Sequence, residues 1–330
     1  MGKIIVTGGA GYIGSHTAKL LKKQNKEVII VDNLEYGHRD IVENNLKIEL
    51  VIGNIGDKNL ISNILSRNQI DAIMHFSAYA YVGESVTSPS KYYQNNFVNT
   101  LNLLDVMIEN HVLNFIFSST CATYGIPQKI PIEENAKQIP INPYGNTKLA
   151  IEKLLADYDN AYKLKYIIFR YFNAAGADID KLTGEDHTPE THIIPLIMYA
   201  ALNKIPHFQI FGDDYDTTDG TCVRDYIHVL DIANAHTLGL EYLLKNQKSD
   251  YFNLGNEQGF SVKEIIQKTE KIIGKKIPTV INQRRDGDPP ILIGNAEKAK
   301  KILKWKTTHS NIEQILQSAW EWHKSRHIIK

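Results

Sequence analysis

The sequence predicts an α/β fold, in which helices cover both faces of a doubly wound parallel sheet and a smaller mixed α/β lobe follows. Strand-like and helix-like segments alternate over about the first 175 of the 330 residues, which is typical of such a sheet. A glycine-rich turn directly follows the first apolar run. After Ala177 the alternation gives way to a polar loop and shorter segments. We therefore expect a first domain at 1–177 and a smaller lobe at 178–330, with some segments of the lobe returning to the first domain.

The first element is a strand expected at Lys3–Thr7, whose apolar run suits a buried parallel strand. The chain then turns through glycines and enters an amphipathic helix at about Ile13. Gly8, Gly11 and Gly14 permit a tight turn, close approach of a pyrophosphate to the backbone, and close packing of helix on strand. Free N–H groups at the helix start then face the anion.

A second strand, expected at Val28–Asp32, completes a dinucleotide-binding pattern of the Rossmann type. It ends at Asp32, eighteen residues after Gly14, which is near the spacing of a ribose-binding carboxylate. A carboxylate accepts hydrogen bonds from a ribose 2′-hydroxyl and repels a 2′-phosphate, so NAD is favoured over NADP. Arg39 lies close downstream, and it leaves NADP as an alternative.

The remaining elements follow the same reasoning in chain order. Further strands of the sheet are expected at Ile48–Ile52, Ala72–His75, Phe115–Ser119 and Tyr166–Arg170, with helices between them that include Asn59–Asn68 and Tyr92–Asn110. A polar loop spans Asp178–Thr191, and the lobe after it contains an apolar segment at His207–Phe211 and helices near Ile194–Leu202, Asp231–Leu244, Val262–Ile273 and Ile312–His323. We place this lobe over the carboxyl ends of the strands, where doubly wound folds bind ligands.

Composition excludes several classes of function. The chain balances 37 basic against 37 acidic residues without long runs of either sign, which argues against nucleic-acid and membrane-surface binding. No apolar stretch approaches the ~18 residues of a membrane span, and the N-terminus leads directly into the first strand, so we expect no signal peptide. Cys121 and Cys222 are isolated, which favours a reducing cytoplasm. The twelve histidines form no HExxH or similar spacing, so we expect no metal site.

The most informative chemistry lies in the segment NPYGNTK at 142–148. If Pro143 opens a helix, Tyr144 and Lys148 are four residues apart and share one face. A tyrosine with a pKa near 10 is a poor base at neutral pH, and lowering its pKa to near 7 takes roughly 4 kcal/mol. One ammonium group about 4 Å away at an effective dielectric near 20 supplies about that much, and a nicotinamide cation would add to it. We therefore expect a proton-transfer pair.

The segment SSTCATYG at 118–125 ends the central strand. Ser118, Ser119 and Thr120 are expected at its carboxyl end, beside the cofactor. Hydroxyl groups at a strand end can simply cap the following turn. Next to the Tyr–Lys pair, Thr120 is also a candidate hydrogen-bond partner for a substrate hydroxyl.

Six motifs together resemble the UDP-glucose 4-epimerases, a family of the extended short-chain dehydrogenase/reductase superfamily. They are TGGAGYIG, SSTCATYG, NPYGNTK, RYFNAAGA, DGTCVRDYIHV and RRDGD, and the resemblance extends over essentially the whole chain. It implies interconversion of UDP-galactose and UDP-glucose with tightly held NAD⁺. A tyrosinate takes the 4-hydroxyl proton while hydride leaves C4, the 4-keto sugar turns in the site, and the hydride returns to its other face. It also implies a homodimer through the helices at Tyr92–Asn110 and Gly145–Tyr162.

The resemblance assigns a role to each matching position. Tyr144 resembles the base, Lys148 the residue that lowers its pKa, and Thr120 the partner of the 4-hydroxyl. The implied cofactor-binding residues are Gly8, Gly11, Tyr12, Ile13, Gly14, Asp32, Asn33, Asn54, Ile55, Phe76, Ala78, Asn95, Ser118, Tyr144, Lys148 and Phe172. The implied substrate-binding residues are Thr120, Asn173, His192, Phe211, Arg224, Arg285, Asp288 and Leu292.

Two arginines support the substrate site independently of the resemblance. Arg224 and Arg285 suit a fork that binds a diphosphate. The alternative is that each pairs with the aspartate next to it, Asp225 or Asp286.

Four positions depart from the pattern of some family members. Asn54 replaces an aspartate that contacts adenine, and its amide oxygen can still accept a hydrogen bond. Ala80 replaces a lysine near the cofactor, and His192 replaces an asparagine, which leaves the role of His192 toward uridine open. Leu292 is shorter than the tyrosine of strict glucose/galactose enzymes, so we expect some activity on UDP-GlcNAc and UDP-GalNAc.

Two alternative functions are weighed against epimerisation. Nucleotide-sugar 4,6-dehydratases of the same superfamily resemble SSTDEVYG at the strand end, and the related decarboxylases keep the Glu. This chain has Cys121 and Ala122 at those positions, and neither can serve as that acid–base pair. The second alternative is a redox sensor or scaffold that binds NAD without catalysis. Such a protein would be expected to lose Tyr144 or Lys148, and both are present.

Overall fold

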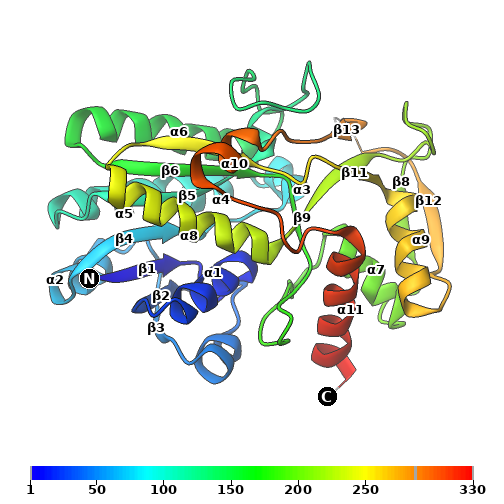
Figure 1. The fold of residues 1–330 in the computed structure, drawn as a ribbon, viewed down its shortest axis with the longest axis horizontal. Coiled ribbons are helices and arrows are strands. Elements are labelled where there is room, and N and C mark those ends of the chain that lie inside the picture. The colour runs from blue at the N-terminus through cyan, green and yellow to red at the C-terminus, as the bar shows by residue number, and fades with distance from the viewer. Residues whose placement is uncertain (1, 286–287, 329–330) are drawn as a thin grey trace.

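The computed structural model describes residues 2–285 and 288–328 (Figure 1). Its main sheet is parallel throughout, and its strands lie in the spatial order β10 (Asp250–Leu254), β6 (Lys165–Tyr171), β5 (Asn114–Thr120), β4 (Ile70–His75), β1 (Lys3–Thr7), β2 (Val28–Asp32) and β3 (Glu49–Ile52). The chain builds outward from β1 to β3 and then returns to place β4 on the other side of β1. The strand order therefore reverses between β1 and β4, where doubly wound sheets bind their ligands.

Helices cover both faces of this sheet because its strands are apolar on both sides. On one face, α1 (Tyr12–Lys23) packs against α8 (Val229–Asn246), and α8 lies on β5 and β6. On the other face lie α2 (Lys58–Arg67), α5 (Asn99–Glu109) and α6 (Pro143–Tyr162) (Figure 1). Each face has its own apolar core, and β2 between them is buried at every position.

The chain after residue 178 contributes to both parts of the molecule. The strand β10 extends the main sheet beside β6, and α10 (Glu297–Leu303) packs against α8 and β10. The strand β10 is not among the strands expected from the sequence.

The smaller lobe is built on short strands. A mixed sheet joins β7 (Asn173–Ala175), β9 (Val223–His228), β11 (Gly259–Ser261) and β13 (Ile291–Leu292), and a parallel pair joins β8 (Phe208–Phe211) to β12 (Thr279–Asn282). Around them lie α7 (Ile193–Ala201), α9 (Val262–Ile273) and α11 (Ile312–Ile328), with a separate apolar core (Figure 1). In the part of the chain that the structure describes, no helix combines the length and apolarity needed to span a bilayer.

The expected α/β class is confirmed, and the six expected strands are present with ends within two residues of their predicted bounds.

The helix expected at Tyr92–Asn110 is interrupted. It consists of α4 (Pro89–Tyr92), the π-helix η2 (Tyr93–Val98) and α5. The Thr100 hydroxyl donates to the Asn96 carbonyl at 2.6 Å where η2 passes into α5. Three short elements complete the chain, namely η1 (Ile41–Leu46), α3 (Val82–Thr87) and η3 (Cys121–Thr123).

Candidate active site

A cavity of ≈1750 Å³ opens at the carboxyl ends of the main-sheet strands and extends to the smaller lobe. Every cofactor, catalytic and substrate residue that the sequence proposed lines this cavity. Pockets for a single drug-sized ligand typically measure about 300–1,000 Å³. The cavity therefore has room for two ligands side by side.

The glycine turn at one end has no space for side chains. Gly8 adopts a φ of 70°, and a Cβ there would lie 2.6 Å from the Ser77 nitrogen. A Cβ on Gly14 would lie 2.3 Å from the Gly8 carbonyl oxygen, because α1 crosses directly over the turn. No side chain caps the start of α1. The first backbone N–H groups of this helix therefore have no capping partner, and they face the cavity. This cradle fits a bound pyrophosphate.

Asp32 braces the same turn from the end of β2. Its Oδ2 accepts the Ala10 amide at 3.0 Å and its Oδ1 accepts the Leu34 amide at 2.8 Å. Burial raises the pKa of this carboxyl group, while the two amides oppose that rise. Each oxygen keeps a further lone pair for a ribose hydroxyl. Arg39, the residue that left NADP open, pairs instead with Glu43 at 2.9 Å on the protein surface.

The two asparagines of the expected adenosine site also shape their own loops. Asn54 Oδ1 accepts the Gly56 amide at 2.7 Å, and Asn33 Oδ1 accepts the Glu35 amide at 3.1 Å. The Asn54 oxygen therefore has one lone pair left for adenine, and its amide NH₂ group also lies at the cavity.

The catalytic candidates lie where α6 meets the end of β5. As expected, α6 begins at Pro143, and Asn142 caps it by accepting the Gly145 amide at 2.8 Å. Lys148 Nζ donates to the Ser118 carbonyl at 2.8 Å, and it lies 6.0 Å from the centre of the Tyr144 ring. The Tyr–Lys pair and the strand end are thus brought together at the cavity wall.

The electrostatics of this pair differ from the sequence expectation. Burial raises the pKa of Tyr144, and the neighbouring Thr120 hydroxyl acts in the opposite direction. Burial lowers the pKa of Lys148 to about 7, although Glu152 opposes this. The net effect of the chain's own groups is therefore a raised pKa of Tyr144, because desolvation outweighs the Thr120 hydroxyl and the lysine is turned toward the Ser118 carbonyl.

Thr120 has the structural role considered for it, and its position is compatible with the second. Its Oγ1 accepts the Ala122 amide at 3.1 Å and caps η3, which is the purely structural role. The same side chain lines the cavity beside Tyr144, so its hydroxyl proton can still be donated to a substrate. Ser118 contacts the Tyr171 hydroxyl by a side-chain hydrogen bond.

The other end of the cavity carries the arginines. Arg224 forms an ion pair with Asp288, whereas Asp225 accepts the amides of Asn256, Glu257 and Gly294. Pairing of Arg224 with the adjacent aspartate is therefore wrong. Arg285 stacks its guanidinium 4.1 Å from the centre of the Phe211 ring. Asp286, the alternative partner of Arg285, lies outside the described residues.

Leu292 and Asn173 complete this end. In the paired strands β9 and β13, Leu292 stands opposite Arg224, and its side chain packs against a small apolar group that contains Tyr124 and Phe172. Asn173 Nδ2 donates to the Asp225 carbonyl at 3.0 Å, which fixes the orientation of its amide at the cavity.

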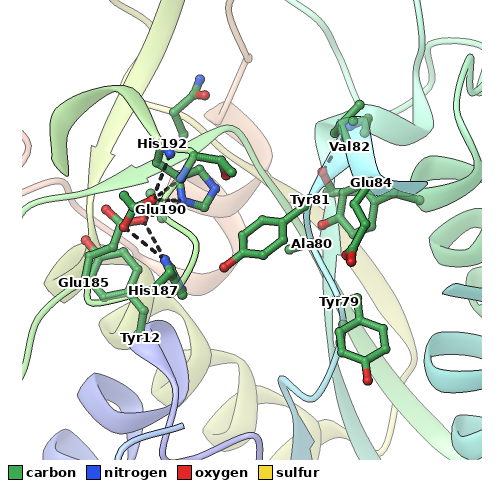
Figure 2. A pocket seen from close by; sticks show the side chains of 18 of the residues that line it. Tyr12, Tyr79, Ala80, Tyr81, Val82, Glu84, Glu185, His187, Glu190 and His192 are labelled. Atoms are coloured by element: carbon green, nitrogen blue, oxygen red, sulfur yellow. Dashed lines mark hydrogen bonds and ion pairs between the residues drawn. The ribbon is translucent and has the colours of Figure 1, made fainter. Parts of the chain in front are cut away.

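His192 lies in a polar cluster that the sequence reasoning did not identify (Figure 2). Glu185, His187 and Glu190 surround it at the cavity wall opposite Tyr81. Partial desolvation lowers the pKa of His192, but the carboxylates of Glu185 and Glu190 outweigh this effect and raise the pKa to about 10. Alternation of carboxylates and imidazoles over 185–192 was the available signal, within a stretch assigned only as a polar loop.

Comparisons with known proteins agree with this geometry. Residues 4–255 match the model of the NAD dependent epimerase/dehydratase family. A UDP-glucose 4-epimerase from Halalkalibacterium halodurans is 50% identical over 321 residues, which cover 97% of this chain and 95% of the relative. The crystal structure of UDP-glucose 4-epimerase from Brucella ovis in complex with NAD has a TM-score of 0.93 and 45% identity, covering 97% of this chain and 98% of that chain.

A further solved structure, the UDP-Glc/GlcNAc 4-epimerase from Campylobacter jejuni, has a TM-score of 0.85 and 41% identity, covering 98% of this chain and 100% of that chain. The chain therefore belongs to the NAD dependent epimerase/dehydratase family, and it shares both its sequence and its fold with UDP-glucose 4-epimerases.

Proposed function

We propose that this protein is an NAD-dependent epimerase that inverts C4 of a UDP-hexose, converting UDP-galactose to UDP-glucose through a transient 4-keto sugar. The observation that carries the proposal is the placement of Tyr144, Lys148 and Thr120 between the two ends of one cavity. One end has the glycine turn that fits a dinucleotide, and the other has Arg224 and Arg285, which suit a diphosphate.

The residues of this chain supply the proton chemistry and the positioning. Tyr144 takes the proton of the 4-hydroxyl and later gives it back, and Thr120 donates a hydrogen bond that orients the sugar oxygen. Burial lowers the pKa of Lys148 to about 7, so the amine is charged only in part at neutral pH. Its protonated form, and the nicotinamide cation when bound, would favour the phenolate form of Tyr144 that accepts the proton. When bound, NAD⁺ supplies the acceptor and donor of the C4 hydride. The size of the cavity leaves space for the sugar to turn while Arg224 and Arg285 keep hold of the diphosphate.

The residues next to Thr120 argue against dehydration. Cys121 and Ala122 occupy the positions at which dehydratases carry their second acid–base pair. Burial raises the pKa of Cys121 to about 12, so its thiol stays neutral at physiological pH and cannot substitute for a carboxylate. The site is thus equipped for one proton shuttle, which is what epimerisation needs.

Activity on N-acetylated sugars is a finer part of the proposal. Leu292 lines the cavity and packs against Phe172, Tyr124 and Ile132. Its side chain is shorter than that of a tyrosine. The Campylobacter jejuni relative is named a UDP-Glc/GlcNAc 4-epimerase. We include interconversion of UDP-GlcNAc and UDP-GalNAc on these grounds.

The proposal also includes a homodimer in the cytoplasm. The helices η2, α5 and α6 carry apolar residues that pack against the core and are still partly exposed, among them Phe97, Leu101 and Leu154. Such residues suit helix packing between two copies. Cys121 and Cys222 are both free thiols, which suits a reducing compartment. Light scattering of the purified protein and cell fractionation test these two points.

The experiment that tests the proposed activity uses purified protein, UDP-galactose and no added NAD⁺, with products separated by chromatography. Formation of UDP-glucose supports the proposal. A 4-keto-6-deoxy product would instead indicate a dehydratase. Bound nicotinamide without any product would indicate the NAD-retaining sensor.

A further inference from the structure

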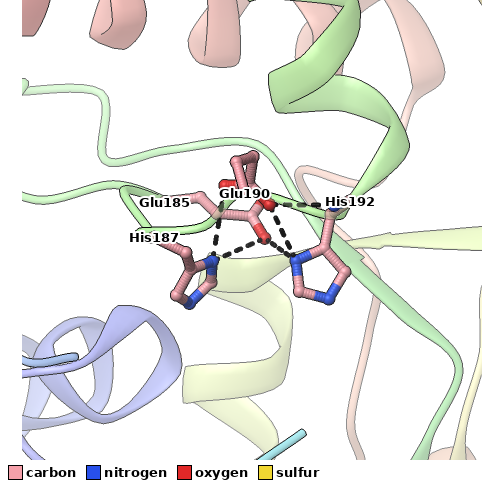
Figure 3. Close-up of side chains that lie close together, drawn as sticks. All are labelled: Glu185, His187, Glu190 and His192. Atoms are coloured by element: carbon pink, nitrogen blue, oxygen red, sulfur yellow. Dashed lines mark hydrogen bonds and ion pairs between the residues drawn. The ribbon is translucent and has the colours of Figure 1, made fainter. Parts of the chain in front are cut away.

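We propose that Glu185, His187, Glu190 and His192, hereafter the 185–192 cluster, bind one divalent transition-metal ion, for which Zn²⁺ is the best match. Figure 3 shows the four side chains turned toward one another, just before α7 begins. The inference goes beyond the proposed function and does not depend on it.

The spacing of the donor atoms fits a small cation. One ligand atom from each residue lies within 4.8 Å of all the others. His187 Nδ1 is 3.6 Å from Glu185 Oε1 and 3.4 Å from Glu190 Oε2. Donors bound to Zn²⁺ at 2.0–2.2 Å in a tetrahedron are separated by about 3.3–3.6 Å. The two contacts of His187 therefore already have the separation that a shared ion requires.

His192 needs a small adjustment. Its Nδ1 lies 2.8 Å from Glu185 Oε1 and 3.2 Å from Glu190 Oε1. The shorter contact would have to open by about half an ångström to match the separations around His187, and the half-exposed ring has room to move. Glu190 meets His187 through Oε2 and His192 through Oε1, so its carboxylate lies between the two rings.

A buried carboxylate oxygen that accepts no hydrogen bond points to a missing ligand. The Glu190 side chain is only 2% exposed. Its Oε1 accepts the amides of Thr191 and His192 at 2.7 and 2.8 Å. Its Oε2 has no hydrogen-bond partner among the described residues, and neither does His187 Nδ1, which faces it at 3.4 Å, a separation at which the two pair only if His187 is protonated. Leaving such groups unsatisfied is costly, whereas a cation between them satisfies both.

The surroundings hold the ligands in place. The Tyr12 and Tyr81 rings contact His187 edge-on, with centroids at 6.4 and 6.1 Å. Tyr81 reaches across the cavity toward the cluster, and its buried hydroxyl has no hydrogen-bond partner in the described chain (Figure 2). That hydroxyl is placed to bond a water molecule on the ion, as outer groups commonly do at metal sites.

The chemistry of the donors selects the class of ion. Imidazole nitrogen suits Zn²⁺, Fe²⁺, Ni²⁺ and Cu²⁺, whereas Mg²⁺ and Ca²⁺ prefer sites made of oxygen alone. Imidazole nitrogen and carboxylate oxygen are both ligands of Zn²⁺, and they occur together in the His₂Glu sets of zinc enzymes. The sequence expectation of no metal site relied on spacings such as HExxH, and the pattern E-x-H-x-x-E-x-H at 185–192 lies outside them. The competing arrangement is a metal-free cluster in which protonated His187 and His192 each pair with both glutamates.

The test uses the full chain, stripped of metal with a chelator and titrated with Zn²⁺ by calorimetry in the presence of excess Mg²⁺. Titration with Co²⁺, followed by its visible absorption, reports four-coordinate geometry. We expect one ion per chain. Glu190→Gln and His187→Gln are expected to weaken binding by at least about 100-fold. The control variants Glu43→Gln and His111→Asn change exposed residues of the same types outside the cluster, and they are expected to bind as the wild type does.

The result can overturn the proposal at each step. Wild-type protein that takes up no stoichiometric Zn²⁺, or cluster variants that bind as tightly as the wild type, would establish the metal-free arrangement. Should a cluster variant fail to fold, X-ray absorption of the Zn²⁺-loaded wild type decides, because the proposal requires two imidazole ligands. None of these readouts measures turnover, so failure here is distinct from failure of the proposed activity.

Discussion

Lys148 donates through its Nζ to the main-chain carbonyl of Ser118 at 2.8 Å, which joins the first turns of α6 to the end of β5. This bond holds the amine at the cavity wall, 6.0 Å from the centre of the Tyr144 ring. The lysine is therefore positioned by the strand and not by the tyrosine.

The first prediction concerns the tyrosine itself. Tyr144→Phe removes the group that exchanges a proton with the sugar, so we expect turnover to fall by about 10²–10⁴-fold or more. The glycine turn is untouched, so the protein should still carry its nicotinamide, measured by absorbance after denaturation. The matched control is Tyr166→Phe, which should keep full activity. Tyr166 lies at the start of β6, and it is not among the residues that line the cavity. Near-normal turnover by Tyr144→Phe would refute the assigned role.

The second prediction concerns the glycine turn. In Gly14→Ala the new Cβ would lie 2.3 Å from the Gly8 carbonyl oxygen, so the turn and α1 must move apart. We expect loss of bound nicotinamide and a decrease of roughly 1–3 kcal/mol in the free energy of unfolding. Urea titration and nucleotide analysis measure the two effects.

Gly83→Ala provides the control for that substitution. It lies in α3, and a Cβ there meets nothing within 4 Å. This variant should be as stable as the wild type or slightly more stable. Equal nucleotide content in both variants would contradict the proposed role of the turn.

The third prediction concerns acid stability. His236 is buried among Phe76, Phe169 and Tyr171, its Nδ1 bonds the Ile232 carbonyl at 2.9 Å, and its Nε2 has no partner among the described residues. Burial lowers its pKa to about 4 in the folded protein, against 6.5 as the ordinary value. The unfolded chain therefore binds more protons as the pH falls, and stability decreases between pH 6.5 and 4.

Replacing this histidine should remove that part of the pH dependence. Between pH 7 and pH 4, the free energy of unfolding of His236→Phe should fall by about 3 kcal/mol less than that of the wild type. Unfolding by urea at a series of pH values measures the difference. The exposed control His111→Asn should follow the wild-type curve. A His236→Phe curve parallel to the wild type would mean that the ring does not titrate in this way.

The fourth prediction concerns substrate size. Leu292→Tyr adds bulk beside Phe172 at the sugar end of the cavity. We expect turnover of UDP-GalNAc to fall by at least 10-fold, while turnover of UDP-galactose is largely kept, since a pocket discriminates by about 1–3 kcal/mol through such steric changes. Parallel assays of both sugars report the ratio. Absence of any N-acetyl turnover in the wild type would end this part of the proposal.

Features encoded by short stretches of chain could be predicted from the sequence. The glycine turn, the apolar strands and the Asn142–Pro143 start of α6 each depend on local chemistry, and all are present in the structure. The seventh strand, β10, could not be found in this way, because its place depends on the chain returning to β6 after about 80 residues.

The electrostatic properties were harder to predict for the same reason. Sequence spacing placed Lys148 one turn from Tyr144, but only the packed structure shows that burial raises the pKa of the phenol and that the amine bonds Ser118. Likewise, Arg224 pairs with Asp288, 64 residues away, and not with its neighbour. Such partners are set by which strands meet, and a linear pattern does not contain that information.

The most direct test of the central claim follows the hydrogen on C4 of the sugar. UDP-galactose that carries deuterium at C4 is converted by the protein in ordinary water, and the product is analysed by NMR and mass spectrometry. The account predicts UDP-glucose that keeps its deuterium at C4, because the same hydride leaves and returns. Loss of the label to solvent, or no conversion at all, would contradict it.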